Sequence, residues 1–352
     1  MSDDNAWAAE RLALLGKKIS ELGLSIHGTR IERLVAQLYD ELEAKGVAFR
    51  PPVYLSDQWG CPDGTPLIGV PFYLVDARLE RIEAEMSASV ESDAESMRYL
   101  RHEAGHAINY AFHLHERPEW RSTFGSFSKP YRERYRADPF SREFVRHILG
   151  WYAQKHPDED FAETFAIWLT PDVDWRGEYA GWPALAKLEY VDRVMREIGA
   201  YAPSVSPPTE DDLPVEAMRY TLAEHYAESA DSVPIEDERQ FDNDLRAIFV
   251  SDADAPGGEG AEWFIRRHHR EIVSRIAYWT SEAPSVVRSF VEHLARRGGA
   301  LALRVGGLEA STLIELTAFG TAVVMNHRYA RTLRRTSRGT RGTRGAAAAA
   351  TA

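Results

Sequence analysis

Two histidines and a glutamate in the segment RHEAGHAINYAF carry the clearest chemical signal in this sequence. His102 and His106 are four residues apart, so on a helix they lie on one face and can direct ring nitrogens at one point. Glu103 is rotated about 100° from His102, so its carboxylate reaches a water molecule beside the metal rather than the metal itself. The spacing predicts a divalent metal site, with Zn²⁺ as the expected ion and Glu103 as a base.

A catalytic zinc site usually has three protein ligands, so a third ligand must come from another segment. The segment DEDFAETFA offers four carboxylates: Asp158, Glu159, Asp160 and Glu163. Glu159 and Glu163 share one helix face with two alanines, whose small side chains permit close approach of another helix. Asp158 and Asp160 are explained as solvated acids at a helix start, where they favour the helix dipole.

Two helices must position these residues. Apolar periodicity predicts one helix from about Ser96 to Phe112, which carries both histidines. A second helix is predicted to begin near His156 and to run through DEDFAETFAIWL. Gly105 costs about 1 kcal/mol relative to alanine inside a helix. Its presence indicates that something packs tightly against the backbone of the first helix.

The N-terminal part is predicted to hold helices and a small sheet. Apolar residues recur at helical spacing over residues 7–22 and 31–42, with Thr29 and Glu32 as a capping box for the second helix. PPVYLSD and TPLIGVPFYLVD predict two short strands joined by a tight connection. Pro71 lacks an N–H donor and therefore places the second strand at a sheet edge.

The fold class predicted from these elements is α+β, mainly helical with a small sheet. Within the first part, residues 117–150 are either an ordered insertion that covers a cleft or a connection packed on the surface. We predict a first domain over 1–201, a Pro-, Ser- and acid-rich linker over 202–214, and an α-helical C-terminal domain of unknown role over 215–333. A basic, alanine-rich tail over 334–352 is predicted to be disordered.

Composition narrows the class of protein. The net charge of -12 and the pI near 5.5 argue against binding to nucleic acid. Cys61 is the only cysteine, which excludes an internal disulfide and fits a cytoplasmic location. The N-terminus lacks the pattern of a secretory signal, and the apolar run over 313–325 is too short and polar to span a membrane. We therefore expect no nucleic-acid and no membrane partner.

Several segments resemble known zinc peptidases. HExxH followed by E-x-x-x-[D/E] on a later helix resembles the glutamate-zincins, and EDFAETFA is similar to a segment of lethal-factor-like metallopeptidases. More closely, RHEAGHAINYAF, GWYAQKHPDEDFAETFAIWL and GWPALAKLEYVD together resemble a family of bacterial zinc-binding metallopeptidases. The resemblance covers roughly residues 8 to 200 and not the C-terminal part. It implies a zincin-like fold for the first domain and a hydrolase of the zinc metalloendopeptidase type.

The resemblance also implies roles for individual residues. Glu159 matches the glutamate that binds zinc beside His102 and His106, and Glu163 matches the acid that orients a ligand histidine. An exchange of roles between Glu159 and Glu163 stays open. Tyr152, seven residues before Glu159, matches a tyrosine that donates a hydrogen bond to the oxyanion. A packed aromatic side chain is the alternative for Tyr152.

The function expected from the sequence is hydrolysis of peptide bonds by a zinc-activated water with Glu103 as general base. A peptide or protein substrate would add to the edge strand Phe72–Val75 through main-chain hydrogen bonds. The C-terminal domain would restrict access or bind a protein partner. Two alternatives are a zinc hydrolase of a non-peptide amide and an inactive zincin-fold scaffold that binds peptides. The intact Glu103 weighs against the scaffold.

Overall fold

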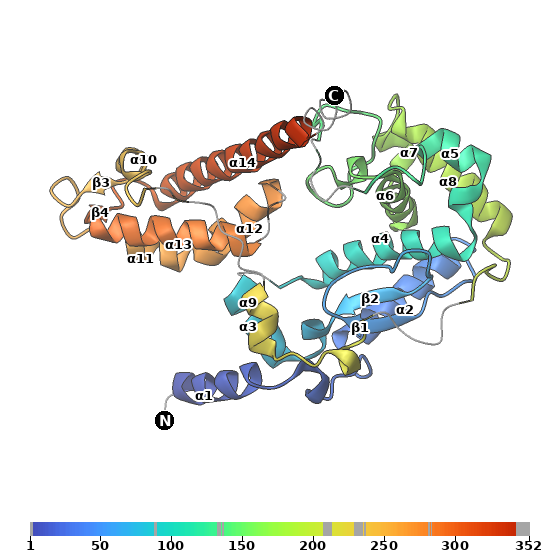
Figure 1. Ribbon diagram of the computed structural model, residues 1–352, viewed down its shortest axis with the longest axis horizontal. Coiled ribbons are helices and arrows are strands. Elements are labelled where there is room, and N and C mark those ends of the chain that lie inside the picture. The colour runs from blue at the N-terminus through green and yellow to red at the C-terminus, as the bar shows by residue number, and fades with distance from the viewer. Residues whose placement is uncertain are drawn as a thin grey trace, which may run out of the picture. The chain divides into compact units, whose positions relative to one another are not determined.

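The computed structural model describes residues 3–87, 90–131, 135, 137–206, 213–228, 235, 237–280, 282 and 284–342. The chain divides into two compact units, one of residues 1–83 and 90–227 and the other of residues 84–89 and 228–352. Both units are mainly helical and each holds one two-stranded sheet in its described part (Figure 1). The predicted mixture of many helices and little sheet is confirmed.

The first unit contains most of the elements. Its helices are α1 (Asp3–Leu15), α2 (Arg30–Ala44), α3 (Ala77–Ser87), α4 (Asp93–Ala111), α5 (Pro118–Phe124), α6 (Pro157–Leu169), α7 (Trp175–Glu178), α8 (Ala184–Ile198) and α9 (Leu222–Glu228). The last residues of α3, from 84 on, and the last residue of α9 group with the second unit. Its 3-10 turns are η1 (Ile19–Glu21), η2 (Phe72–Val75), η3 (Leu114–Glu116), η4 (Tyr152–Gln154) and η5 (Val215–Ala217). Its strands are β1 (Val53–Ser56) and β2 (Ile68–Pro71).

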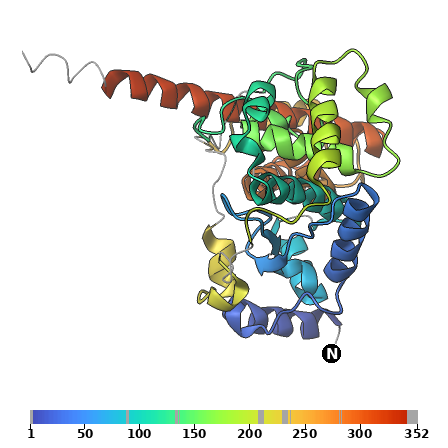
Figure 2. The ribbon, with the colours of Figure 1, turned by 90° about the vertical axis from the view of Figure 1, so that its right-hand side faces the viewer.

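Helix α4 lies at the centre of a stack of helices. It contacts α2 on one side and α6 on another, and α6 in turn contacts α8. Figure 2 shows this stack with α2 in blue and α8 in yellow-green. The core between these helices is made of large apolar side chains that include Leu38, Leu100, Ile108, Phe161, Phe165 and Leu188. Burial of these side chains fixes the position of α4 against α6.

The two helices predicted to carry the histidines and the glutamates are confirmed as α4 and α6. A side chain caps the N-terminus of each helix. Ser92 caps α4 by accepting a hydrogen bond from the backbone of Glu95, whose side chain accepts from the Ser92 backbone in return. This capping box was not predicted. His156 caps α6 by accepting from the backbone N–H of Asp158, and Pro157 occupies the first helical position.

The capping box predicted for α2 is wrong. The Thr29 hydroxyl donates to the carbonyl of Ile26 at 2.6 Å instead of capping the helix. The Glu32 carboxylate accepts from the backbone N–H of Gly28 at 2.8 Å. The chain enters α2 through a turn in which Gly28 has a φ of +77°, and this turn brings the amide of Gly28 to Glu32.

The small sheet differs from the prediction in topology. β1 and β2 are parallel, with Val53 opposite Ile68, so the connection over residues 57–67 is a crossover and not a tight turn. Within this connection Gly60 forms an antiparallel bridge to Gly69. Pro71 ends β2, and Phe72–Val75 forms the turn η2. The predicted edge strand at Phe72–Val75 is therefore wrong, because Phe72 and Leu74 turn into the core.

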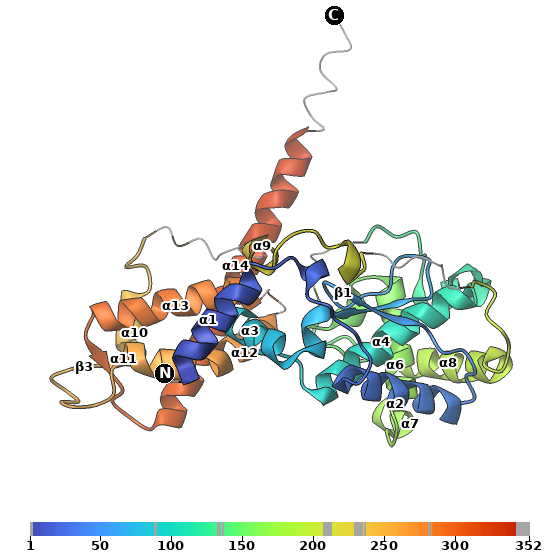
Figure 3. The same ribbon diagram turned by 90° about the horizontal axis from the view of Figure 1, so that it is seen from below.

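The second unit is a group of helices around its own apolar core (Figure 3). Its elements are α10 (Asp242–Ile248), β3 (Val250–Ser251), α11 (Ala261–Arg267), α12 (His269–Thr280), α13 (Pro284–Ala300), β4 (Leu303–Arg304) and α14 (Glu309–Gly342). α14 continues through Gly342, and the predicted disorder over residues 334–352 stays a prediction. Residues 343–352 lie outside the described residues.

Residues 215–227 group with the first unit. The backbone N–H of Ile19 donates to Tyr220 O at 3.2 Å, and that of Ser20 donates to Met218 O at 3.1 Å. Residues 207–212 of the predicted linker lie outside the described residues, so the predicted domain limits stay a prediction. None of the helices in the described part of the chain has the length and apolar character needed to cross a bilayer.

Candidate metal centre

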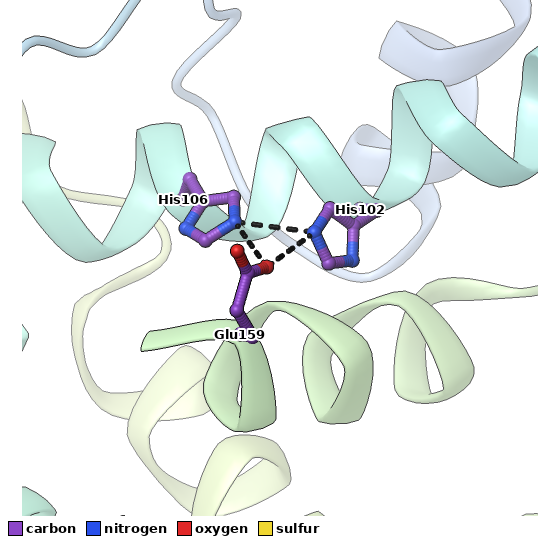
Figure 4. Close-up of side chains that lie close together, drawn as sticks. All are labelled: His102, His106 and Glu159. Atoms are coloured by element: carbon purple, nitrogen blue, oxygen red, sulfur yellow. Dashed lines mark hydrogen bonds and ion pairs between the residues drawn. The ribbon is translucent and has the colours of Figure 1, made fainter. Parts of the chain in front are cut away.

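Three side chains from α4 and α6 meet at one point (Figure 4). Glu159 Oε2 lies 3.0 Å from His102 Nε2 and 3.2 Å from His106 Nε2, and the two Nε2 atoms are 3.1 Å apart. All three side chains are buried. His102, His106 and Glu159 thus form a group that could hold a metal ion. They are the residues that the sequence and its resemblance single out as ligands.

The other ring nitrogen of each histidine faces a carboxylate. His102 Nδ1 lies 2.9 Å from Glu163 Oε1, and His106 Nδ1 lies 2.9 Å from Asp158 Oδ2. A carboxylate favours a proton on the nitrogen that faces it, which leaves a lone pair on each Nε2 atom. Two imidazole lone pairs and one carboxylate oxygen then converge on the same point. A cation satisfies such a group of acceptors.

The distances fit a small tetrahedral ion. Zinc binds imidazole nitrogen and carboxylate oxygen at about 2.0–2.2 Å, so the edges between its tetrahedral ligands measure about 3.3–3.6 Å. The three ligand atoms here are 3.0, 3.1 and 3.2 Å apart. Outward movements of a few tenths of an ångström bring them to those edges. Two imidazoles and one carboxylate are also a ligand set that catalytic zinc uses.

Glu163 is fully buried behind His102. Its Oε2 atom accepts from the backbone N–H groups of His147 at 3.1 Å and Ile148 at 2.8 Å. These amides belong to the stretch between α5 and α6, so the insertion over residues 117–150 helps to hold this carboxylate. Glu163 therefore stands where the resemblance expected an acid behind a ligand histidine.

Asp158 and Asp160 are buried, and their prediction as solvated acids is wrong. Asp158 accepts from Asn109 Nδ2 at 2.7 Å and from the Tyr110 hydroxyl at 2.6 Å, besides facing His106. Asp160 forms an ion pair with Lys187 at 2.6 Å. The first turn of α6 is enclosed by its neighbours rather than exposed, so its acids need partners within the protein.

The charged groups of the cluster shift one another's pKa values. Burial lowers the pKa of His102, but hydrogen bonds to Glu159 and Glu163 outweigh burial and raise it to about 9. Burial raises the pKa of Glu159, but the hydrogen bonds from His102 and His106 hold it well below its usual range. Protons and metal ions compete for such ligands. The cluster accordingly favours positive charge at its centre.

A cavity of about 910 Å³ opens onto this cluster. It is lined by residues of the β1–β2 connection, of α4, of the stretch after α5 and of the region before α6, and these include Trp59, Gly60, Glu103, Phe127, Tyr131, Tyr152 and Lys155. Burial raises the pKa of Glu103, which suits a proton acceptor that works near neutral pH. Phe127, Ser128, Lys129 and Tyr131 line the cavity, which favours the cleft-covering alternative for the insertion.

Tyr152 lies beside the cluster. Its ring centroid is 5.6 Å from that of His102, and its hydroxyl lies 3.3 Å from Lys155 Nζ. It is partly exposed to the cavity rather than fully packed in the core. Its position is compatible with contact to a substrate, and its role stays a prediction.

Two residues near the ligands were missed from the sequence. Asp158 faces His106, but an acid at a helix start has the same pattern whether it is solvated or buried. The hydroxyl of Tyr131 donates to Glu159 Oε1. Tyr131 lies in a stretch without regular periodicity, so no pattern in the sequence could have placed it at the cluster.

The comparisons with known proteins agree with this geometry. The model of a family described as "Putative zinc-binding metallo-peptidase" matches residues 79–173. Comparison with curated proteins and with solved structures gives no significant match. The matched segment contains the two histidines, Glu103, Tyr152 and both glutamates of α6. Over residues 79–173 the chain is similar to this family, and the match does not extend to the rest of the chain.

Proposed function

We propose that this protein is a zinc-dependent metallopeptidase that hydrolyses peptide bonds in its first unit. One observation carries the proposal: Glu103 lines the same cavity onto which the ligand atoms of His102, His106 and Glu159 converge. A site that only binds zinc has no need of an additional buried carboxylate in this position. The family match supports the same class of reaction.

The proposed ligands are His102, His106 and Glu159, with Glu163 and Asp158 orienting the two imidazoles. When bound, zinc supplies Lewis acidity and lowers the pKa of water to about 7.

Glu103 carries the proton transfer in this proposal. It accepts a proton from the attacking water while the oxygen–carbon bond forms at the scissile carbonyl. It then delivers that proton to the leaving nitrogen as the carbon–nitrogen bond breaks.

Tyr152 is the proposed donor to the oxyanion. Its ring lies beside His102 on the wall of the cavity, and Lys155 Nζ lies 3.3 Å from its hydroxyl. A phenol that donates to negative charge in a water-poor site stabilises the transition state more than the ground state. Lys155 adds a positive charge on the same side of the cavity.

The substrate is proposed to bind along the connection between β1 and β2. Gly60 directs both its N–H and its C=O at Gly69, with distances of 3.3 and 2.7 Å. Trp59, which lies in a bend, and Cys61 flank Gly60 with main-chain N–H and C=O groups that do not bridge to Gly69. Trp59 and Cys61, which line the cavity, would then offer these groups to an extended peptide. This segment replaces Phe72–Val75, which is a turn.

The deciding experiment compares the wild type with Glu103→Gln and His102→Ala. Zinc content is measured on each purified protein, and cleavage is measured by proteome-wide profiling of peptide termini. Glu103→Gln is expected to retain zinc and to lose cleavage, whereas His102→Ala is expected to lose both. Wild-type cleavage by Glu103→Gln would remove this glutamate from the mechanism.

A further inference from the structure

We propose that Tyr131 is a positioning residue that makes Glu159 bind the metal through one oxygen only. The inference rests on the proposed zinc site and concerns how that site keeps a position open for water. Tyr131 comes from the stretch after α5, outside the motifs that identify the site.

The two carboxylate oxygens of Glu159 have different partners, and Tyr131 contacts one of them. The Tyr131 hydroxyl donates to Glu159 Oε1. The other oxygen, Oε2, is the atom that lies 3.0 Å from His102 Nε2 and 3.2 Å from His106 Nε2. A carboxylate can bind a metal with one or both oxygens, and a hydrogen bond to one oxygen holds that oxygen away from the ion.

Residues that directly precede α6 hold the ring of Tyr131 in place. Lys155 Nζ lies 4.4 Å from the centroid of the Tyr131 ring, and the His156 ring centroid lies 5.4 Å from it. His156 Nε2 also lies 2.7 Å from Lys129 O, two residues before the tyrosine. The tyrosine is thus held by residues that immediately precede the helix of its partner Glu159.

Core packing does not account for this tyrosine. Its exposed fraction is 49%, so much of its surface faces outward at the rim of the cavity. A tyrosine needed only for hydrophobic burial would lie deeper and would not direct its hydroxyl at a buried glutamate. The contact with Glu159 is the feature that distinguishes Tyr131 from a surface aromatic residue.

The consequence concerns coordination number. Three protein ligands and one water give the four-coordinate arrangement of catalytic zinc. If Glu159 bound through both oxygens, the second oxygen would occupy the space that water needs. The hydroxyl of Tyr131 therefore preserves the position at which Glu103 works.

The test uses Tyr131→Phe, which removes one oxygen atom and keeps the ring contacts. The full-length protein is loaded with Co²⁺, whose visible absorption depends on coordination geometry. We expect the variant to lose absorption intensity and to show shifted bands, because a second carboxylate oxygen joins the ion. Its unfolding temperature in the metal-free form is measured beside that of the wild type, because the variant also loses the hydrogen bond to Glu159.

Tyr135→Phe is the matched control. Tyr135 lies in the same stretch, but its hydroxyl donates to Gly150 O at 2.7 Å. This variant is expected to keep the wild-type spectrum. A wild-type spectrum in Tyr131→Phe would overturn the inference and leave the zinc site intact. If the wild type bound no Co²⁺, or if His102→Ala bound it equally well, the zinc site itself would be overturned, and the role of Tyr131 with it.

Discussion

A Cβ atom placed on Gly105 would lie 2.7 Å from the Cα atom of Ala162. At this point the backbone of α4 meets the backbone of α6 with no side chain between them. The contact lies between His102 and His106 along α4, and Ala162 lies between Glu159 and Glu163 along α6. The close crossing of these helices is what brings the carboxylates of one to the imidazoles of the other.

Gly105→Ala is expected to push these helices apart. Alanine favours the helix by about 1 kcal/mol, but overpacking in a buried contact costs about 1–3 kcal/mol. Because the atoms in contact are backbone Cα and O, neither can rotate away. We expect lower zinc affinity, measured by competition with a chromophoric chelator, and a net loss of stability in urea unfolding.

Gly16→Ala is the control for this substitution. A Cβ there would meet its nearest atoms at 3.7 and 3.8 Å, which is ordinary contact. This variant should bind zinc as the wild type does. Undiminished zinc affinity in Gly105→Ala would show that the ligands do not depend on the close crossing.

This contact also shows what could be predicted from the sequence. A glycine inside a helical pattern and small residues beside Glu159 both indicated a close helix approach. The two helices that carry the proposed ligands followed from apolar periodicity. The pairing of β1 with β2 could not be predicted, because short apolar runs have the same pattern in parallel and antiparallel ladders. The burial of Asp158 depends on neighbours distant in sequence.

Asp158→Asn is expected to weaken metal binding by about 10–100-fold, the usual cost of removing a partner behind a ligand histidine. The amide has nearly the shape of the carboxylate but lacks the charge that faces His106 Nδ1 at 2.9 Å. Asp192→Asn on α8 is a matched control, because Asp192 accepts from Trp168 and Arg176 instead. Equal zinc affinities for the two variants would argue that Asp158 has no part in orienting His106.

His147 should contribute to acid sensitivity. Burial lowers the pKa of His147 from 6.5 to about 4, although the Glu163 carboxylate acts in the opposite direction. Between these pH values the unfolded chain binds a proton that the folded chain does not, so stability falls as pH decreases from 6.5 to 4. A difference of about 2.5 pH units corresponds to at most about 3.4 kcal/mol.

The measurement for His147 is the free energy of unfolding between pH 4 and pH 7 in the presence of a chelator, so that metal release adds no slope. His147→Gln lacks a titrating group but can still donate to Arg98 O, to which His147 Nε2 lies 2.9 Å. We expect the variant to lose stability less steeply than the wild type as pH falls. Parallel curves would contradict a neutral imidazole at this position.

Removal of zinc should destabilise the wild type, because an ion that binds only the folded chain stabilises it by mass action. The contribution is about 2.7 kcal/mol at a free zinc concentration 100 times the dissociation constant. The unfolding temperature is measured with zinc and with a chelator, and His102→Ala is expected to abolish the difference.

His113 and His115 form with Glu116 a second, more exposed group that could hold an ion. Replacement of His113 and His115 by alanine should leave the zinc-dependent shift in place. Loss of the shift in that variant would instead assign the stabilising ion to the group that follows the C-terminal end of α4.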